Sequence, residues 1–171
     1  MGSYNFLDTD DIIERASGMS INEIFETEGE PGFRKVESQV LDSVHAYVRC
    51  VISTGGGIVT QIENWSKLHT GIVVWLDCPP DVILKRLQAG GLDSRPLLQS
   101  GDPEQKLRDL LEQRKEKYEQ ADIRIEISDN MEARDVADVV IRELHDFIDN
   151  NPPAWKVAKA KAKADGLDWI K

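Results

Sequence analysis

Short apolar runs alternate with longer amphipathic stretches along this chain of 171 residues. The run at 71–77 is almost continuously apolar, which is typical of a strand covered on both of its faces. Strands that alternate with helices of ten or more residues build βαβ units and a mostly parallel sheet. The alternation therefore predicts an α/β fold whose ligands bind beyond the carboxyl ends of the strands.

Capping residues and helix breakers set the boundaries of the elements. Ser20 and Glu23 have the spacing of a capping box, and Gly29 and Pro31 interrupt the helical pattern that follows. Strands are expected at 4–7, 49–53, 71–77 and 123–127. Helices are expected at 11–17, 20–25, 32–47, 62–69, 80–90, 103–121 and 131–148. We expect one domain over residues 1–150 and a Lys- and Ala-rich tail over 151–171.

The composition excludes some classes of function. The net charge of −10 would repel a phosphate backbone, so we expect no nucleic-acid partner. No run of about 18 apolar residues is present, so no membrane partner is expected either. The N-terminus has neither a signal-peptide nor a transit-peptide pattern. Cys50 and Cys78 lack metal or redox spacing, and we expect both to be buried thiols of a reducing compartment.

Two predicted strand ends carry residues suited to chemistry. Asp8 and Asp10 follow the first strand, where one carboxylate can lie near a metal while the other accepts a proton from the substrate. The alternative is ordinary turn chemistry, in which Asp is common. Gly55, Gly56 and Gly57 follow the second strand and would let a ligand approach the backbone closely, whereas a flexible turn is the alternative.

The glycine segment is not a phosphate-binding loop of the Walker A type. That loop needs Gly-Lys followed by Ser or Thr, and the chain contains no Gly-Lys dipeptide.

Three arginines are candidate ligand-binding groups. Arg34 and Glu37 lie on one face of a predicted helix, and taken alone they are expected to form a surface ion pair of little energetic value. Arg95 lies in a polar loop, from which an arginine can reach a transferring phosphoryl group or simply stay solvated. Arg114 lies beside an apolar stripe, where its guanidinium can point into a cleft or its stem can cover apolar surface.

The order and spacing of these motifs resemble those of the shikimate kinase family over residues 6–148. The motifs are Asp8-Thr9-Asp10, Ile24-Phe25, Phe33-Arg34 with Glu37, Gly55-Gly56-Gly57, Arg95-Pro96-Leu97-Leu98 and Arg114 with Tyr118. The segment 64–77 is similar to the plant plastid branch and its shikimate-kinase-like relatives. The resemblance implies a three-layer αβα, P-loop-kinase-like parallel sheet, from which this chain lacks the first, central strand.

The resemblance also implies roles for individual residues. Asp10 would hold the shikimate hydroxyls and act as the base, and Arg34 and Arg114 would bind the shikimate carboxylate. The other implied site residues are Gly55, Gly56 and Gly57 as the site lining, Phe25 and Phe33 as its apolar wall, Arg95 as the lid arginine near the phosphates, and Asp8 near the magnesium ion. In the complete protein the cofactor would be MgATP, and its γ-phosphoryl group would pass to the shikimate 3-hydroxyl.

The departure from the family pattern leads to further expectations. Without a Walker A loop, the chain as given is expected to bind no nucleotide productively and to be inactive. Loss of a central strand would expose two sheet edges. We expect low stability, pairing of strand 49–53 with strand 71–77, or oligomerisation through these edges.

The alternative function is a non-catalytic, shikimate-kinase-like protein with a binding or regulatory role in plastids. The resemblance implies a chloroplast location, and otherwise a soluble cytoplasmic one.

Overall fold

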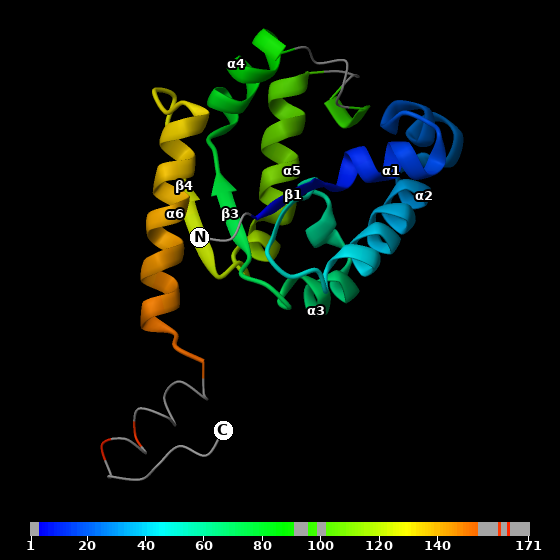
Figure 1. Ribbon diagram of the computed structural model, residues 1–171. Helices are drawn as coiled ribbons and strands as arrows, with labels where there is room; N and C mark the ends of the chain where they lie inside the picture. The colour runs from blue at the N-terminus through cyan, green and yellow to red at the C-terminus, as the bar shows by residue number, and fades with distance from the viewer. Residues whose placement is uncertain (1–3, 91–95, 99–101, 154–160, 162–163, 165–171) are drawn as a thin grey trace. The chain divides into compact units, whose positions relative to one another are not determined.

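Helices and short parallel strands alternate along the chain, as the apolar pattern predicts (Figure 1). The computed structural model describes residues 4–90, 96–98, 102–153, 161 and 164. The chain divides into two compact units, 1–129 and 130–171. The domain boundary expected after residue 150 stays a prediction. Within the described residues, no helix is long and apolar enough to cross a membrane.

The elements match the expected ones in type and order. The strands are β1 (Asn5–Asp8), β2 (Cys50–Ser53), β3 (Val74–Asp77) and β4 (Ile123–Glu126). The α-helices are α1 (Thr9–Ser17), α2 (Ile21–Val44), α3 (Trp65–Leu68), α4 (Pro80–Gly90), α5 (Pro103–Tyr118) and α6 (Ala133–Asn150). The short 3-10 helices are η1 (Ile58–Thr60), η2 (Ile62–Asn64) and η4 (Pro96–Leu98). The predicted helix at 62–69 is a 3-10 turn followed by one α-helical turn, and the 3-10 helices η1 and η4 were not predicted.

The four strands form two separate parallel pairs in the described part of the chain. β1 pairs with β2, and Asp8 lies opposite Ser53 at their carboxyl ends. β3 pairs with β4, and Asp77 lies opposite Glu126. The register of the first pair places the acidic residues after β1 and the glycines after β2 at one edge of the sheet, as the parallel-strand rule predicts.

One of the three alternatives for the strand edges and one expectation about β3 are wrong. β2 and β3 do not pair in the residues that the structure describes. The intervening segment instead buries Ile58, Val59 and Trp65 against Leu41 of α2, so that the chain turns toward α2 after β2. β3 is not covered on both faces either, because Leu76 is 52% exposed. Successive side chains of a strand point to opposite faces, so Leu76 lies on an exposed face of β3, whereas Trp75 on the other face stacks on Tyr118.

Helix α2 contains the expected interruption. Ser20 and Glu23 form a complete capping box at its N-terminus. Gly29 has non-helical angles (φ 68°, ψ 179°), a left-handed φ that glycine adopts without strain. The kink divides α2 into two helical parts, and Glu30 lies at the start of the second part.

The second part of α2 is packed against two clusters of apolar residues. One cluster joins Ile13 of α1 to Ile24, Phe33 and Val40 of α2. The other is the cluster of Leu41 with the segment after β2. Burying each such side chain stabilises the fold by about 1.5–3 kcal/mol. The two clusters therefore hold α2 in a fixed position against α1 and the segment after β2, and with it the candidate site residues of α2.

Candidate functional site

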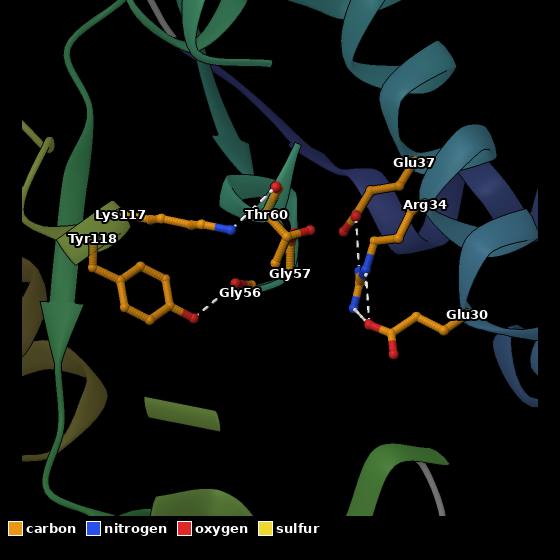
Figure 2. A network of polar contacts seen from close by, with 8 residues as sticks. All are labelled: Glu30, Arg34, Glu37, Gly56, Gly57, Thr60, Lys117 and Tyr118. Carbon is orange, nitrogen blue, oxygen red and sulfur yellow. Dashed lines mark hydrogen bonds and ion pairs between the residues drawn. The ribbon is translucent and has the colours of Figure 1, made fainter. Parts of the chain in front are cut away.

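The centre of the candidate site is Arg34, whose side chain is almost completely buried. Its Nη1 donates a hydrogen bond of 2.8 Å to Oε2 of Glu37. Its Nε and Nη2 donate to Oε1 of Glu30 at 3.2 and 2.9 Å. The three residues lie three and four positions apart on α2, so their side chains share one face of the helix (Figure 2). The expectation of a surface ion pair between Arg34 and Glu37 is wrong, because tertiary packing buries both side chains.

Glu37 is a fully buried carboxylate. Loss of hydration raises the pKa of Glu37 above its ordinary value, while the neighbouring Arg34 and, more weakly, Arg114 lower this pKa. The charge of Asp10 also raises the pKa of Glu37. Asp10 of α1, Arg34 of α2 and Arg114 of α5 therefore all act electrostatically on the Glu37 carboxylate.

The glycine segment lies directly against these side chains. A Cβ atom at Gly57 would overlap the Arg34 guanidinium, and one at Gly56 would lie 2.8 Å from the Tyr118 hydroxyl. The Tyr118 hydroxyl donates a hydrogen bond of 2.7 Å to the Gly56 carbonyl. Lys117 donates to the Thr60 carbonyl at 3.2 Å (Figure 2). Close approach of side chains from α2 and α5, rather than flexibility, explains why these positions are glycine.

A cavity of about 160 Å³ opens between these elements. Dry cavities of roughly 150 Å³ hold a benzene ring, so this space suits a single six-membered ring. Eight of the predicted site residues line it: Asp10, Phe25, Phe33, Arg34, Gly55, Gly56, Gly57 and Arg114. The rings of Phe25 and Phe33 lie 4.6 Å apart and form an apolar wall. One side of the cavity is thus apolar, and the other carries arginines and carboxylates.

Asp8 is not among the residues that line the cavity. The Asp8 carboxylate accepts a hydrogen bond of 2.9 Å from the Asp10 backbone N–H and caps the N-terminus of α1. This is the turn chemistry that the sequence left open as an alternative for Asp8. Arg95 lies outside the described residues.

Sequence reasoning missed several residues of the site. Glu30 binds Arg34, Tyr118 binds the Gly56 carbonyl, and Lys117 binds the Thr60 carbonyl. The sequence analysis named Tyr118 as part of a motif, but it assigned none of these three residues a role. The spacing of four residues between Glu30 and Arg34 was the available signal for the first contact. The other lining residues that sequence analysis did not assign are Ile21, Glu37, Leu97, Leu98, Leu107 and Leu110.

A second, larger hollow of about 760 Å³ lies beside β3, α5 and the end of β4. None of the predicted site residues that the structure describes lines it. Trp75 stacks on Tyr118 there, with ring centroids 5.6 Å apart, and the Arg124 guanidinium lies 4.9 Å from the Trp75 ring. We take the smaller cavity as the candidate site, because its charged side chains Arg34 and Glu37 are buried. The side chains of Arg108 and Arg124 in the larger hollow are about half exposed, so water screens their charges.

The fold and the smaller cavity define an α/β protein with a ring-sized cavity that arginines, carboxylates and two phenylalanines line. A family model described as shikimate kinase matches residues 1–145. The chain therefore belongs to the shikimate kinase family.

Curated relatives and solved structures agree with this assignment. A shikimate kinase of Nostoc sp. is 49% identical over 141 residues, which are 82% of this chain and 77% of the relative. A shikimate kinase of Trichormus variabilis is 55% identical over 122 residues, 71% of this chain and 66% of the relative. The chain thus spans about two thirds to three quarters of the length of these relatives.

The structure is similar to that of the shikimate kinase from Acinetobacter baumannii in complex with shikimate. The TM-score is 0.78 at 40% sequence identity, and the match covers 88% of this chain and 82% of the other. This similarity identifies the fold as α/β and P-loop-kinase-like, in agreement with the sequence-based expectation.

Proposed function

We propose that this chain forms the shikimate-binding part of a shikimate kinase, and that the complete protein transfers the γ-phosphoryl group of ATP to the shikimate 3-hydroxyl. The observation that carries the proposal is the convergence of Asp10, Arg34, Arg114 and the glycine segment on one ring-sized cavity. The relative from Acinetobacter baumannii, whose structure contains shikimate, supports the choice of ligand.

Each wall of the cavity fits one part of the proposed ligand. Arg34 and Arg114 would bind the carboxylate, because a guanidinium donates two parallel hydrogen bonds to that group. Phe25 and Phe33 would cover the face of the ring. The ring would lie close to the backbone of Gly55, Gly56 and Gly57, which line the cavity.

Asp10 is the proposed base on the hydroxyl side of the ligand. It follows β1 in the first turn of α1 and lines the cavity together with the two arginines. The Asp10 carboxylate would accept a hydrogen bond, and then the proton, from a hydroxyl of the bound ring. Arg95 is proposed as the lid arginine at the transferred phosphoryl group.

The residues of this chain do not by themselves fit MgATP. MgATP would supply the phosphoryl group and the metal charge that stabilises its transfer. Among the described residues, no three His, Cys, Asp or Glu side chains are grouped to hold a metal ion. The Asp8 carboxylate, the proposed magnesium neighbour, caps α1. The 171 residues contain no Gly-Lys-Ser/Thr loop for the phosphates. We therefore derive no step of the reaction through the nucleotide.

Calorimetric titration of the chain with shikimate tests the binding proposal. We expect saturable binding by the wild-type chain. In Arg114→Met, shikimate should bind about tenfold or more weakly, because one charge-assisted contact to the carboxylate is lost. Arg108→Met is the matched control, since Arg108 is on the same helix but lines the larger hollow. Wild-type chain that binds no shikimate, or binding that is equal in both variants, would contradict the proposal.

A kinase assay of the complete protein separates the two functions that the sequence left open. Release of ADP that depends on shikimate identifies a kinase, whereas binding of shikimate without release of ADP identifies a non-catalytic relative. The curated relatives are called shikimate kinases, which favours the first result.

Three further proposals concern the branch of the family, the cellular location and the oligomeric state. We propose kinship with the plant plastid branch and a chloroplast location for the complete protein. Imaging of a fluorescent fusion would test the location.

We also propose that the edges of β2 and β3 mediate oligomerisation, because no described strand joins them. Light scattering after size-exclusion chromatography would give the oligomeric state.

A further inference from the structure

One edge of the Arg34 guanidinium is already bound by a carboxylate of the protein itself. Nε and Nη2 both donate to Oε1 of Glu30, at 3.2 and 2.9 Å. These two N–H groups form the fork with which arginine binds carboxylates bidentately. Glu30 therefore occupies the position that a carboxylate ligand of Arg34 would take (Figure 2).

The two carboxylates that bind Arg34 differ in their freedom to move. The Glu37 side chain is fully buried, whereas the Glu30 side chain is 45% exposed. Removal of Glu37 from Arg34 would leave a buried charge unpaired, which is costly. Glu30 follows the kink at Gly29 and can turn into solvent, where water replaces its hydrogen bonds.

A ligand carboxylate meets Glu30 at either edge of the guanidinium. At the Nε and Nη2 edge, the ligand must displace the Glu30 carboxylate. At the Nη1 and Nη2 edge, the ligand shares Nη2 with Glu30, and two negative charges then lie close together. In both geometries the charge of Glu30 opposes the charge of the ligand.

We propose that Glu30 is an internal competitor that limits the affinity of the site for carboxylate ligands. This inference rests on the proposed function, in which Arg34 binds the shikimate carboxylate. Glu30 keeps the Arg34 side chain ordered before the ligand arrives, and it speeds the departure of any carboxylate that binds. A product that keeps the substrate's carboxylate would be released faster for the same reason.

The test compares the chain with Glu30→Gln, which keeps the length of the side chain and removes its charge. Shikimate and its methyl ester are titrated into both proteins by calorimetry. We expect Glu30→Gln to bind shikimate about three- to tenfold more tightly, the range for a partly exposed ion pair in which one carboxylate oxygen accepts two N–H groups. The methyl ester carries no charged carboxylate, so its affinity should be the same in both proteins.

Glu26→Gln is the matched control, because Glu26 is an exposed residue of the same helix. It removes the same charge from the protein and should leave the affinity for shikimate unchanged. High salt should reduce the gain from Glu30→Gln, since screening weakens interactions at a partly exposed site.

The possible failures are distinguishable. Equal or weaker binding of shikimate by Glu30→Gln, while the wild-type chain binds it, overturns the role of Glu30 as competitor and leaves the proposed function in place. An equal gain for shikimate and its methyl ester also overturns it, because a change in the structure of the site would then explain the gain. If neither protein binds shikimate, the proposed function fails and this inference fails with it.

Discussion

Gly57→Ala tests the packing on which the candidate site depends. The added Cβ would overlap Cζ, Nη1 and Nη2 of Arg34. Arg34 is buried and bound by Glu30 and Glu37, so its guanidinium cannot turn away freely. To reach ordinary contact, the guanidinium must retreat by about 1 Å or more. Such a movement would stretch the hydrogen bond of 2.8 Å to Glu37 beyond hydrogen-bonding range.

The size of the expected effect follows from the lost contact. A hydrogen bond between charged groups contributes about 1.5–3 kcal/mol, and the free energy of unfolding should fall by about this amount. Displacement of Arg34 also removes a carboxylate-binding group, so shikimate should bind about tenfold or more weakly. Urea unfolding and calorimetric titration measure the two effects.

Gly71→Ala is the matched control for this prediction. A Cβ at Gly71 would meet no atom within 4 Å, so this variant reports only the effect of the added methyl group on the chain. The reasoning is refuted if the two variants agree within about 0.5 kcal/mol in stability and bind shikimate equally.

Two further predictions concern the neighbours of Arg34 and the glycine segment. Tyr118→Phe removes the hydrogen bond to the Gly56 carbonyl and should lower the free energy of unfolding by about 1 kcal/mol and weaken shikimate binding several-fold. Urea unfolding and titration check this, and unchanged values for both would show that the hydroxyl does not hold the segment. Burial raises the pKa of Glu37, so the carboxyl takes up protons on folding. The stability of the wild-type chain relative to Glu37→Gln should therefore be greatest below pH 4.5, the ordinary value, and fall as the pH rises through the raised pKa. Urea unfolding of both proteins across this range measures the difference, and a difference that is constant with pH would contradict the assignment.

Much of the secondary structure could be predicted because it depends on neighbouring residues. The capping box of Ser20 and Glu23 and the kink at Gly29 are present as expected. The carboxyl ends of β1 and β2 meet at one edge, so the sequence also predicted that Asp10 and the glycine segment would lie close together. The parallel-strand rule needs only the order of the elements along the chain.

The pairing of the strands could not be predicted in the same way. The sequence was compatible with a ladder between β2 and β3, but the segment after β2 packs against Leu41 instead. Which strand edges meet depends on the volume and burial of residues far apart in the sequence. Local propensity carries no information about this choice.

The sequence by itself determined the order of strands and helices and the chemical type of the site residues, because periodicity, capping and motif spacing are local properties. Only the tertiary structure decided what surrounds Arg34. The spacing of Arg34 and Glu37 on the helix predicts only a surface ion pair. Tertiary packing buries both side chains and places Arg34 at the centre of the site. Contacts from α5 to the glycine segment, such as that of Tyr118 with Gly56, join residues 62 positions apart. Such contacts arise only when packed surfaces meet, so no window of sequence contains them.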